Sequence, residues 1–432
     1  MTLRNRATEQ PSNHHDPYAA LRFADFRRLI LAYGTTTVAR EAQIVVVGWQ
    51  IFAITNDPLS LGLIGLAEAL PFIAVALYAG HIADRANRRT IAIVGTIGIA
   101  LSVVALLAFT VMPSVLAARR VWPMYAVIFA SGIARSFTRP AVSALSAELI
   151  PRELYPSAVA WRSSTWQFSA ILGPALGGLL YGFAGPAWSY VVVLILTIAS
   201  IAAFALIAYE AQPLPAANLG VGESLQAGLR FLWSQPVLLS AMTLDLFSVL
   251  FGGATALLPV FAKILGVGPE GLGVLRAAPA IGSLLIGIYI AHRPPFRRAG
   301  ITLFATVAVF GLCMIAFALS RNFWLSFALL TLSGVADNIS VLIRGTLLQT
   351  LTPTELLGRV SAVNQIFIGS SNEIGAFESG VAARLLGTVP SVVFGGVMTL
   401  VTVGVVTVLW PELVRLGSLE HLEPPEPAEA VV

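Results

Sequence analysis

Two long apolar runs, at residues 61–79 and 90–112, constrain the possible folds of this chain more than any other feature. Each run is long enough to cross the hydrocarbon core of a bilayer as a helix. Between them lies an island of charge, Gly80-His81-Ile82-Ala83-Asp84-Arg85-Ala86-Asn87-Arg88-Arg89. Because so few residues separate the runs, we expect a very short loop between two membrane helices.

The composition extends this reading to the whole chain. Of the 432 residues, 57% are hydrophobic and only 11% are charged, and the mean hydropathy is +0.82. A soluble protein carries roughly a quarter charged residues, so we predict an all-α polytopic membrane protein. The pI near 9.4 then reflects loop arginines that orient helices, not nucleic-acid binding. We expect no cofactor and no metal ion, since the five histidines and the single cysteine form no metal-ligand spacing.

Twelve membrane helices are expected. They fall near 26–54, 61–79, 90–112, 124–149, 158–181, 187–209, 237–262, 271–291, 300–320, 323–348, 357–386 and 389–411. The predicted organisation is a cytoplasmic tail at 1–25, a six-helix bundle at 26–210, a linker at 211–236, a second six-helix bundle at 237–411 and an acidic tail at 412–432. In the linker, Leu225, Leu229 and Leu232 repeat at helical spacing. That pattern favours an amphipathic helix on the cytoplasmic membrane surface over a disordered linker.

The second half of the chain repeats the first. Ser131-Gly132-Ile133-Ala134 matches Ser333-Gly334-Val335-Ala336 at an offset of 202 residues, and Pro151-Arg152-Glu153-Leu154 matches Pro353-Thr354-Glu355-Leu356 at the same offset. Tandem repeats of this kind predict two bundles related by an axis along the membrane normal.

Arginine placement predicts the orientation. Fifteen of the 26 basic residues fall in tails, loops and adjoining span ends on the side of the termini, against four in loops on the other side. Positive charge gathers in the cytoplasm, so we expect both termini there. The remaining seven lie inside spans, where a charge facing lipid is costly. The third, sixth, ninth and twelfth spans carry no charge, so we expect these four at the periphery.

The charges inside the other spans are the candidate functional residues. Arg135 and Arg139 are four residues apart, and Asp337 and Arg344 seven apart, so each pair lies on one face of a helix. Arg40 and Glu41 point roughly 100° apart, so we expect Glu41 to meet an arginine of another helix. Glu41, Asp337 and Glu373 are the proton-coupling candidates. The candidate cavity charges, which contact substrate or fix helix register, are Arg40, Arg135, Arg139, Arg344 and Asp245. Thr36, Gln43 and Asn338 are weaker candidates for polar cargo contacts.

The charged island, with its form G-x-x-A-D-R-x-x-R-R, resembles the loop motif between the second and third helices of the major facilitator superfamily of secondary transporters. An ordinary positive-inside loop would need the arginines but not Asp84 or the spaced Gly80. The resemblance implies the twelve-helix fold in which helices one, four, seven and ten line a central cavity. We predict a conformational latch at the cytoplasmic ends of the two halves. Its members are Gly80, Asp84, Arg85, Arg88, Arg89 and Glu148.

A second motif concerns the direction of transport. Gly173, Pro174, Gly177 and Gly178 resemble the G-P-x-x-G-G core of the antiporter motif in this superfamily, although Ser169 stands where an upstream glycine would be. Simple close packing of helices would use the same residues, and would suit an importer equally well.

Three further segments resemble the drug and siderophore exporters related to the enterobactin exporter and the macrolide-efflux proteins. They are Leu61-Gly62-Leu63 followed by Glu68-Ala69-Leu70-Pro71-Phe72, then Arg139-Pro140-Ala141, and Leu258-Pro259-Val260-Phe261. The resemblance implies a monomeric exporter of a small organic molecule in the bacterial inner membrane.

Nothing in the chain resembles a nucleotide-binding loop, so we expect the proton gradient to drive export, and no enzymatic activity. The partners expected are the cargo, protons and the lipid bilayer. The alternatives are an importer or passive facilitator of a small metabolite, and a lipid flippase on the same fold.

Overall fold

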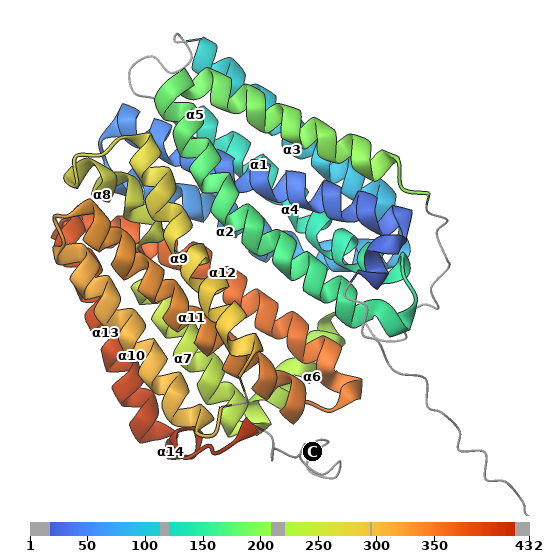
Figure 1. Ribbon diagram of the computed structural model, residues 1–432, viewed down its shortest axis with the longest axis vertical. Coiled ribbons are helices and arrows are strands. Elements are labelled where there is room, and N and C mark those ends of the chain that lie inside the picture. Colours follow the sequence, from blue (N-terminus) through green and yellow to red (C-terminus); the bar gives the residue numbers. More distant parts are fainter. Residues whose placement is uncertain (1–17, 113–120, 209–220, 294–295, 420–432) are drawn as a thin grey trace, which may run out of the picture.

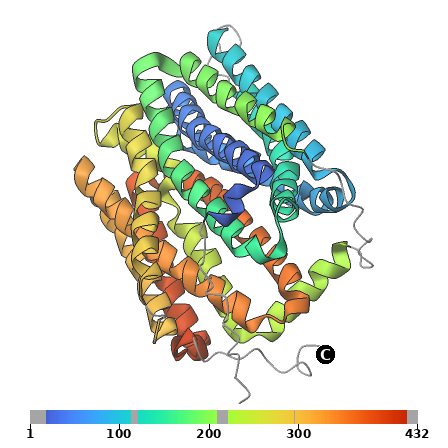
Figure 2. The ribbon, with the colours of Figure 1, turned by 45° about the vertical axis from the view of Figure 1, so that its right-hand side comes forward.

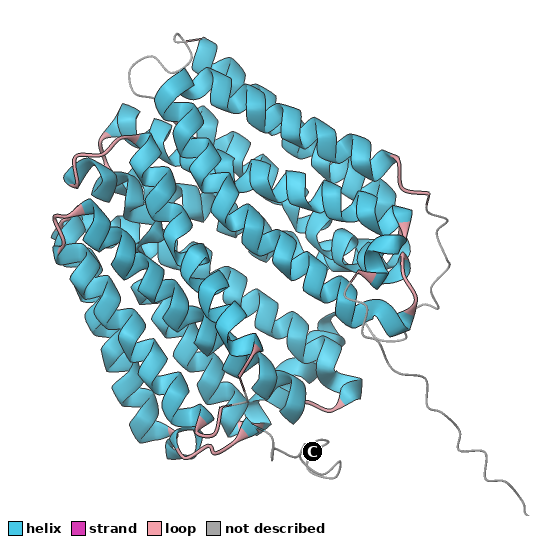
Figure 3. Cartoon of the chain, viewed as in Figure 1, coloured by secondary structure: helices cyan, strands magenta, loops and turns pink. Residues whose placement is uncertain are grey.

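The protein is a bundle of long helices, with no strand in any part of the chain that the structure describes (Figure 3). The structure is a computed structural model and describes residues 18–112, 121–208, 221–293 and 296–419. Each of the twelve stretches predicted to be a span is mainly helical. Eight helical stretches are long and apolar enough to cross a membrane. Helices α1, α4 and α12 are not among these eight because they carry the charged and polar residues of the site described below.

The first half consists of α1 (Ala24–Thr55), α2 (Pro58–Arg85), α3 (Arg88–Val111), α4 (Trp122–Glu148) and α5 (Tyr155–Ala205). Helix α5 supplies two of the expected spans because Gly185 has a φ of +81° and Pro186 follows it, which breaks the helix there. Helices α1 and α5 pack together along their lengths, as do α2 and α4, and α3 lies outside them (Figure 1).

The second half consists of α7 (Pro236–Gly252), α8 (Leu258–Ile264), α9 (Pro269–Ala291), α10 (Ala299–Leu319), α11 (Phe323–Leu351), α12 (Thr354–Leu386) and α13 (Thr388–Leu409). Helices α7 and α8, with a short 3-10 turn between them, make up one expected span. Helix α10 packs against α11 and α13, and α9 packs against α11. The four-residue helix α14 (Pro411–Val414) follows α13.

Two helix pairs make the most extensive contacts between the halves, α2 with α12 and α5 with α9 (Figures 1 and 2). One hydrophobic cluster also crosses between the halves. In it Phe52 and Leu61 from the first half pack with Leu257, Phe261 and Leu272 from the second. All five residues lie near the end of the molecule where α1 ends and α2 begins. The halves are therefore packed together at that end.

The uncharged helices present apolar side chains outward, as predicted. Val94 and Leu101 on α3, Leu312 on α10, and Val401 and Val408 on α13 are all exposed. Such surfaces suit contact with lipid, and the charged helices lie between them.

The loop in the charged island is very short, as expected, since α2 continues to Arg85 and only Ala86 and Asn87 separate it from α3. The Asn87 side chain accepts a hydrogen bond from the N–H of Thr90 and so caps α3. The linker contains the expected helix, α6 (Val221–Ser234), and part of its apolar face packs on protein. This helix packs against α12, and Phe231 and Leu232 are buried in the core of the second half. Leu229 is partly exposed, and the Leu225 side chain lies outside the described residues.

Candidate functional site

A cavity of about 260 Å³ lies between the halves and is bounded mainly by α1, α2, α4 and α5, with α12 on the other side. It extends from Gln43 and Glu68, near the middle of α1 and α2, to Tyr33 and Arg162, near the beginning of α1 and α5. Its charged lining residues are Arg40, Glu68, Arg135, Arg139, Arg162 and Glu373. Of the predicted site residues, Arg40, Arg135, Arg139 and Glu373 therefore meet at one cavity, and the suggested cargo contacts Thr36 and Gln43 line it too.

The first half supplies a chain of ion pairs in the cavity wall. Arg40 lies 3.2 Å from Oε1 of Glu41 and 3.7 Å from Oε2 of Glu68, and Arg135 donates to Oε1 of Glu68 at 2.9 Å. We expected Glu41 to meet an arginine of another helix. Its ion pair is instead with Arg40 of its own helix, because the long Arg40 side chain bends toward its neighbour, while Arg135 pairs with Glu68.

The second half contributes two charges to this group. Glu373 on α12 lines the cavity and lies within electrostatic range of Glu68, Arg40 and Arg135. Arg276 on α9 lies within electrostatic range of Glu41, and its Nε is buried with no hydrogen-bond partner among the described residues. Neither Glu373 nor Arg276 forms an ion pair in the described part of the chain. Charges of the two halves thus approach one another without direct pairing.

Asp245, Asp337 and Arg344 do not belong to this cavity. Arg344 on α11 forms an ion pair with Asp245 on α7. Asp337, on the same face of α11, lies within electrostatic range of Arg344 and Asp245 but makes no hydrogen bond or ion pair to any described residue. Asn338 donates to the backbone carbonyl of Ser283 on α9, so its side chain binds protein.

The antiporter-like motif lies where α5 meets α1 and α9. A Cβ on Gly173 would lie 2.5 Å from the Cβ of Glu41, and one on Gly177 would lie 2.6 Å from the carbonyl oxygen of Ala42. Gly178 faces the second half, where a Cβ would lie 2.8 Å from the Cα of Gly273. Pro174 is buried in the same stretch. Because these glycines have no side chain, the backbone of α5 packs directly against α1 of the first half and α9 of the second.

The described residues of the predicted latch bind within the first half. Arg88 forms an ion pair with Glu148 at the end of α4, and Arg89 donates to the backbone carbonyls of Phe204 and Ala205 at the end of α5. A contact of Glu148 with Asp84 or Arg85 stays a prediction. The side chains of Asp84 and Arg85, and the surroundings of Gly80, lie outside the described residues.

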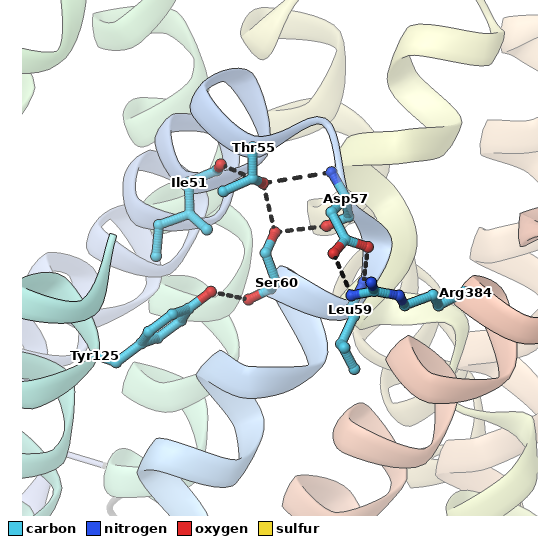
Figure 4. A network of polar contacts seen from close by, with 7 residues as sticks. All are labelled: Ile51, Thr55, Asp57, Leu59, Ser60, Tyr125 and Arg384. Carbon is cyan, nitrogen blue, oxygen red and sulfur yellow. Dashed lines mark hydrogen bonds and ion pairs between the residues drawn. The ribbon is translucent and has the colours of Figure 1, made fainter. Parts of the chain in front are cut away.

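Polar contacts between the halves are described at the other end of the molecule, where α1 ends and α2 begins. Arg384 on α12 donates to Oδ2 of Asp57 at 2.8 Å (Figure 4). Lys263 on α8 donates to Oδ1 of Asn56 at 2.8 Å. Sequence reasoning missed this group, although Asn-Asp-Pro is a recognisable turn and cap at the start of a helix. Glu68, Arg162 and Arg276 were recognisable as charges inside spans but were not assigned to the site, since their spacing does not show which helices they contact.

Comparisons with known proteins agree with this architecture. A profile of the Major Facilitator Superfamily matches residues 29–376, and the chain belongs to that family. An enterobactin exporter, EntS, of Citrobacter koseri is 29% identical over 415 residues, which cover 93% of this chain and 94% of the relative. EntS of an Escherichia coli O1:K1 strain is 28% identical, covering 92% and 94%.

Solved transporters share the fold at low sequence identity. The nucleoside transporter NupG superposes with a TM-score of 0.71 at 11% identity, over 89% of this chain and all of that structure. A bacterial homologue of the lysosomal transporter Spinster gives a TM-score of 0.65 at 16% identity, over 91% and 96%. The protein is thus a multi-pass membrane transporter of this superfamily, and not an enzyme.

Proposed function

We propose that the protein exports a small organic molecule, a drug-like compound or a siderophore, across the bacterial inner membrane by proton antiport and alternating access. The observation that carries the proposal is the cavity between the halves. It is lined by charges from both halves, and the described residues pack the halves together at the end where α1 ends and α2 begins. A site that is reached from one side at a time is what alternating access requires.

The arginine bias supports the direction. With both termini in the cytoplasm, the packed end carrying Asp57 and Arg384 faces the periplasm. The cavity then extends toward the cytoplasm, because Tyr33 and Arg162 lie near the helix ends on the cytoplasmic side. Cargo would load from the cytoplasm in this conformation. The likeness to proteins named as enterobactin exporters supports outward transport, as does the G-P-x-x-G-G core of α5.

Glu373 is the carboxylate that best fits the coupling role. Glu41 and Glu68 are each paired with arginine, whereas Glu373 faces Glu68 across the boundary between the halves without an ion pair of its own in the described residues. A proton on Glu373 removes the repulsion between the two carboxylates while the halves are close. When α2 moves away from α12, the two carboxylates no longer repel each other strongly, and Glu373 can release its proton. Helix movement and proton transfer are therefore linked. Glu41 and Asp337 are the secondary candidates.

The same fold would also serve an importer, a passive facilitator or a lipid flippase. A passive facilitator has no need of a titratable carboxylate in its cavity, so loss of the response to a pH gradient on changing Glu373 separates it from an antiporter. The exposed faces of the outer helices are mainly apolar, so they do not favour a flippase over a carrier of soluble cargo.

Reconstituted vesicles test the proposal. The cargo is first identified as a compound to which a deletion strain loses tolerance, or as a siderophore that the strain retains. An imposed pH gradient should then drive this cargo against its concentration gradient. Glu373→Gln should keep downhill exchange and lose the uphill response, with Glu41→Gln and Asp337→Asn tested in parallel. Glu378→Gln, one to two turns further along α12 and outside the cavity lining, is the matched control. Uphill transport by all three test variants would overturn the proton sites proposed here.

A further inference from the structure

Arg162 is an arginine in the cavity wall without a carboxylate partner. Its Nη1 donates to the hydroxyls of Ser143 at 3.3 Å and Ser146 at 3.0 Å, both on α4. Its Nε is buried and has no acceptor among the described residues. No described carboxylate lies within ion-pair distance, and the titratable group near it is the Tyr33 phenol. Arg40 and Arg135, by contrast, are paired with glutamates.

The cavity as a whole also carries excess positive charge. Four arginines line it against two glutamates, Glu68 and Glu373. A cationic wall inside a low-dielectric membrane protein attracts an anion strongly, since little solvent is present to screen the charge. An arginine that merely reached the lipid headgroups would turn its guanidinium outward. Arg162 instead lines the cavity and hides its Nε in protein.

Aromatic surface adjoins this charge. Trp166 lies one helical turn beyond Arg162 on α5, lines the same cavity and is 46% exposed. The guanidinium carbon of Arg162 lies 5.7 Å from the centre of the Tyr33 ring on α1. An acidic group bound to Arg162 would therefore bring an attached planar ring close to the side chains of Trp166 and Tyr33, where stacking is favourable.

We propose that Arg162, Trp166 and Tyr33 form a subsite for an aromatic organic anion, and that the cargo carries such a group. This inference rests on the proposed transport function for its biological meaning, but the subsite binds its ligand without any gradient. Arg162 supplies the charge that selects an acid over its neutral analogue, and the hydroxyls of Ser143 and Ser146 orient its guanidinium.

Equilibrium binding to the purified full-length protein in phosphatidylcholine nanodiscs tests this. The probes are naphthalene-2-carboxylate and the neutral naphthalene-2-carboxamide, which share ring and size. Wild-type protein should bind the carboxylate about tenfold or more tightly than the amide, as expected for a charge-assisted contact. Arg162→Gln should bring this ratio close to one. Arg162→Lys, which keeps the charge without the planar fork, should retain a clear preference. Arg321→Gln, on an exposed loop, should leave the ratio unchanged.

A double variant distinguishes a ligand-binding role of Arg162 from a purely structural one. If Arg162 only held α4 against α5, then Ser143→Ala combined with Ser146→Ala would abolish the preference as Arg162→Gln does. We expect this pair to retain most of it. Equal binding of the two probes by wild-type protein, no binding of the carboxylate, or an unchanged ratio in Arg162→Gln would each overturn the subsite. Failure of proton-driven transport in vesicles, with the ratio still dependent on Arg162, would instead refute the coupling and leave the subsite standing.

Discussion

Arg384 near the end of α12 donates to Oδ2 of Asp57, 2.8 Å away, while Oδ1 of the same carboxylate accepts the backbone N–H of Leu59 at 3.1 Å and caps α2 (Figure 4). One side chain thus begins a helix of the first half and binds a helix of the second. The surrounding turn is fixed by Ser60, whose hydroxyl donates to the Asp57 carbonyl and contacts the Thr55 hydroxyl at 2.8 Å.

The two roles of Asp57 can be separated by mutation. Asp57→Asn keeps an oxygen for the cap and loses the charge, whereas Asp57→Ala loses both. The pair is half exposed, and such pairs contribute about 0.2–1 kcal/mol, so Asp57→Asn and Arg384→Gln should each shift the equilibrium between conformations up to about fivefold. Asp57→Ala should in addition lower the thermal unfolding temperature.

Distances between spin labels on cysteines placed at Ala53 and Leu385 measure this shift, because the native Cys313 is buried and should not be labelled. The longer-distance population should grow in Asp57→Asn and Arg384→Gln alike. Distances unchanged in both variants would show that apolar packing alone closes this end.

Gly178 offers a sharper test of how the halves close. A Cβ there would lie 2.4 Å from the carbonyl oxygen of Pro269 and 2.8 Å from the Cα of Gly273, both backbone atoms of α9. Gly178→Ala should therefore destabilise this conformation by about 1–3 kcal/mol. The ratio of this conformation to the others would then fall roughly 5- to 150-fold. Transport in vesicles should fall accordingly. Gly404→Ala on α13 is the matched control, because a Cβ there meets nothing within 4 Å. Equal activity of the two variants would show that α5 and α9 need not approach so closely during transport.

The sequence predicts where the helices lie, which helices are peripheral, and four of the cavity residues. It can do so because the length of an apolar run and the cost of a charge in lipid are properties of single segments. The predicted cavity residues that do meet are Arg40, Arg135, Arg139 and Glu373. Pairing was much less predictable. Whether Arg135 meets Glu68 or Glu41 depends on how α4 rotates against α1 and α2, and the local sequence does not encode that rotation.

Residues that join the halves were the hardest to foresee. Arg384 near a helix end looked able to reach the membrane surface, and only the fold brings it to Asp57, which lies 327 positions away in sequence. Asp337 shares a helical face with Arg344, yet Asp245 on α7 forms the ion pair with that arginine.

The role of Asp84 in the charged island stays a prediction. Asp84→Asn should impair transport while the protein still inserts and is expressed, and an equal loss of expression and transport would favour a structural role.

The orientation of the chain in the membrane can be tested by thiol labelling. With both tails in the cytoplasm, cysteines introduced at Ala7 and Ala428 should not react with a membrane-impermeant thiol reagent in intact cells, and should react after permeabilisation. A cysteine at Arg321, in the short loop between α10 and α11, should react in intact cells and serves as the opposite control. Protection at Arg321 together with labelling at the tails would reverse the direction in which the cavity opens.

The last prediction concerns the ion pair between Glu68 and Arg135, which is largely shielded from solvent at 2.9 Å. Breaking a buried pair by removing one partner costs about 3–5 kcal/mol, because it leaves the other charge unpaired. Arg40 still lies 3.7 Å from Glu68, so Arg135→Gln should cost about 3 kcal/mol, near the lower limit. In detergent, Arg135→Gln and Glu68→Gln should each lower the thermal unfolding temperature. The double variant should be more stable than the sum of the two losses predicts, because it leaves no lone charge. Arg415→Gln, exposed beyond α14, should leave the temperature unchanged. Strictly additive losses would mean that the two side chains do not stabilise each other, and that the charges in this wall are held in place for cargo instead.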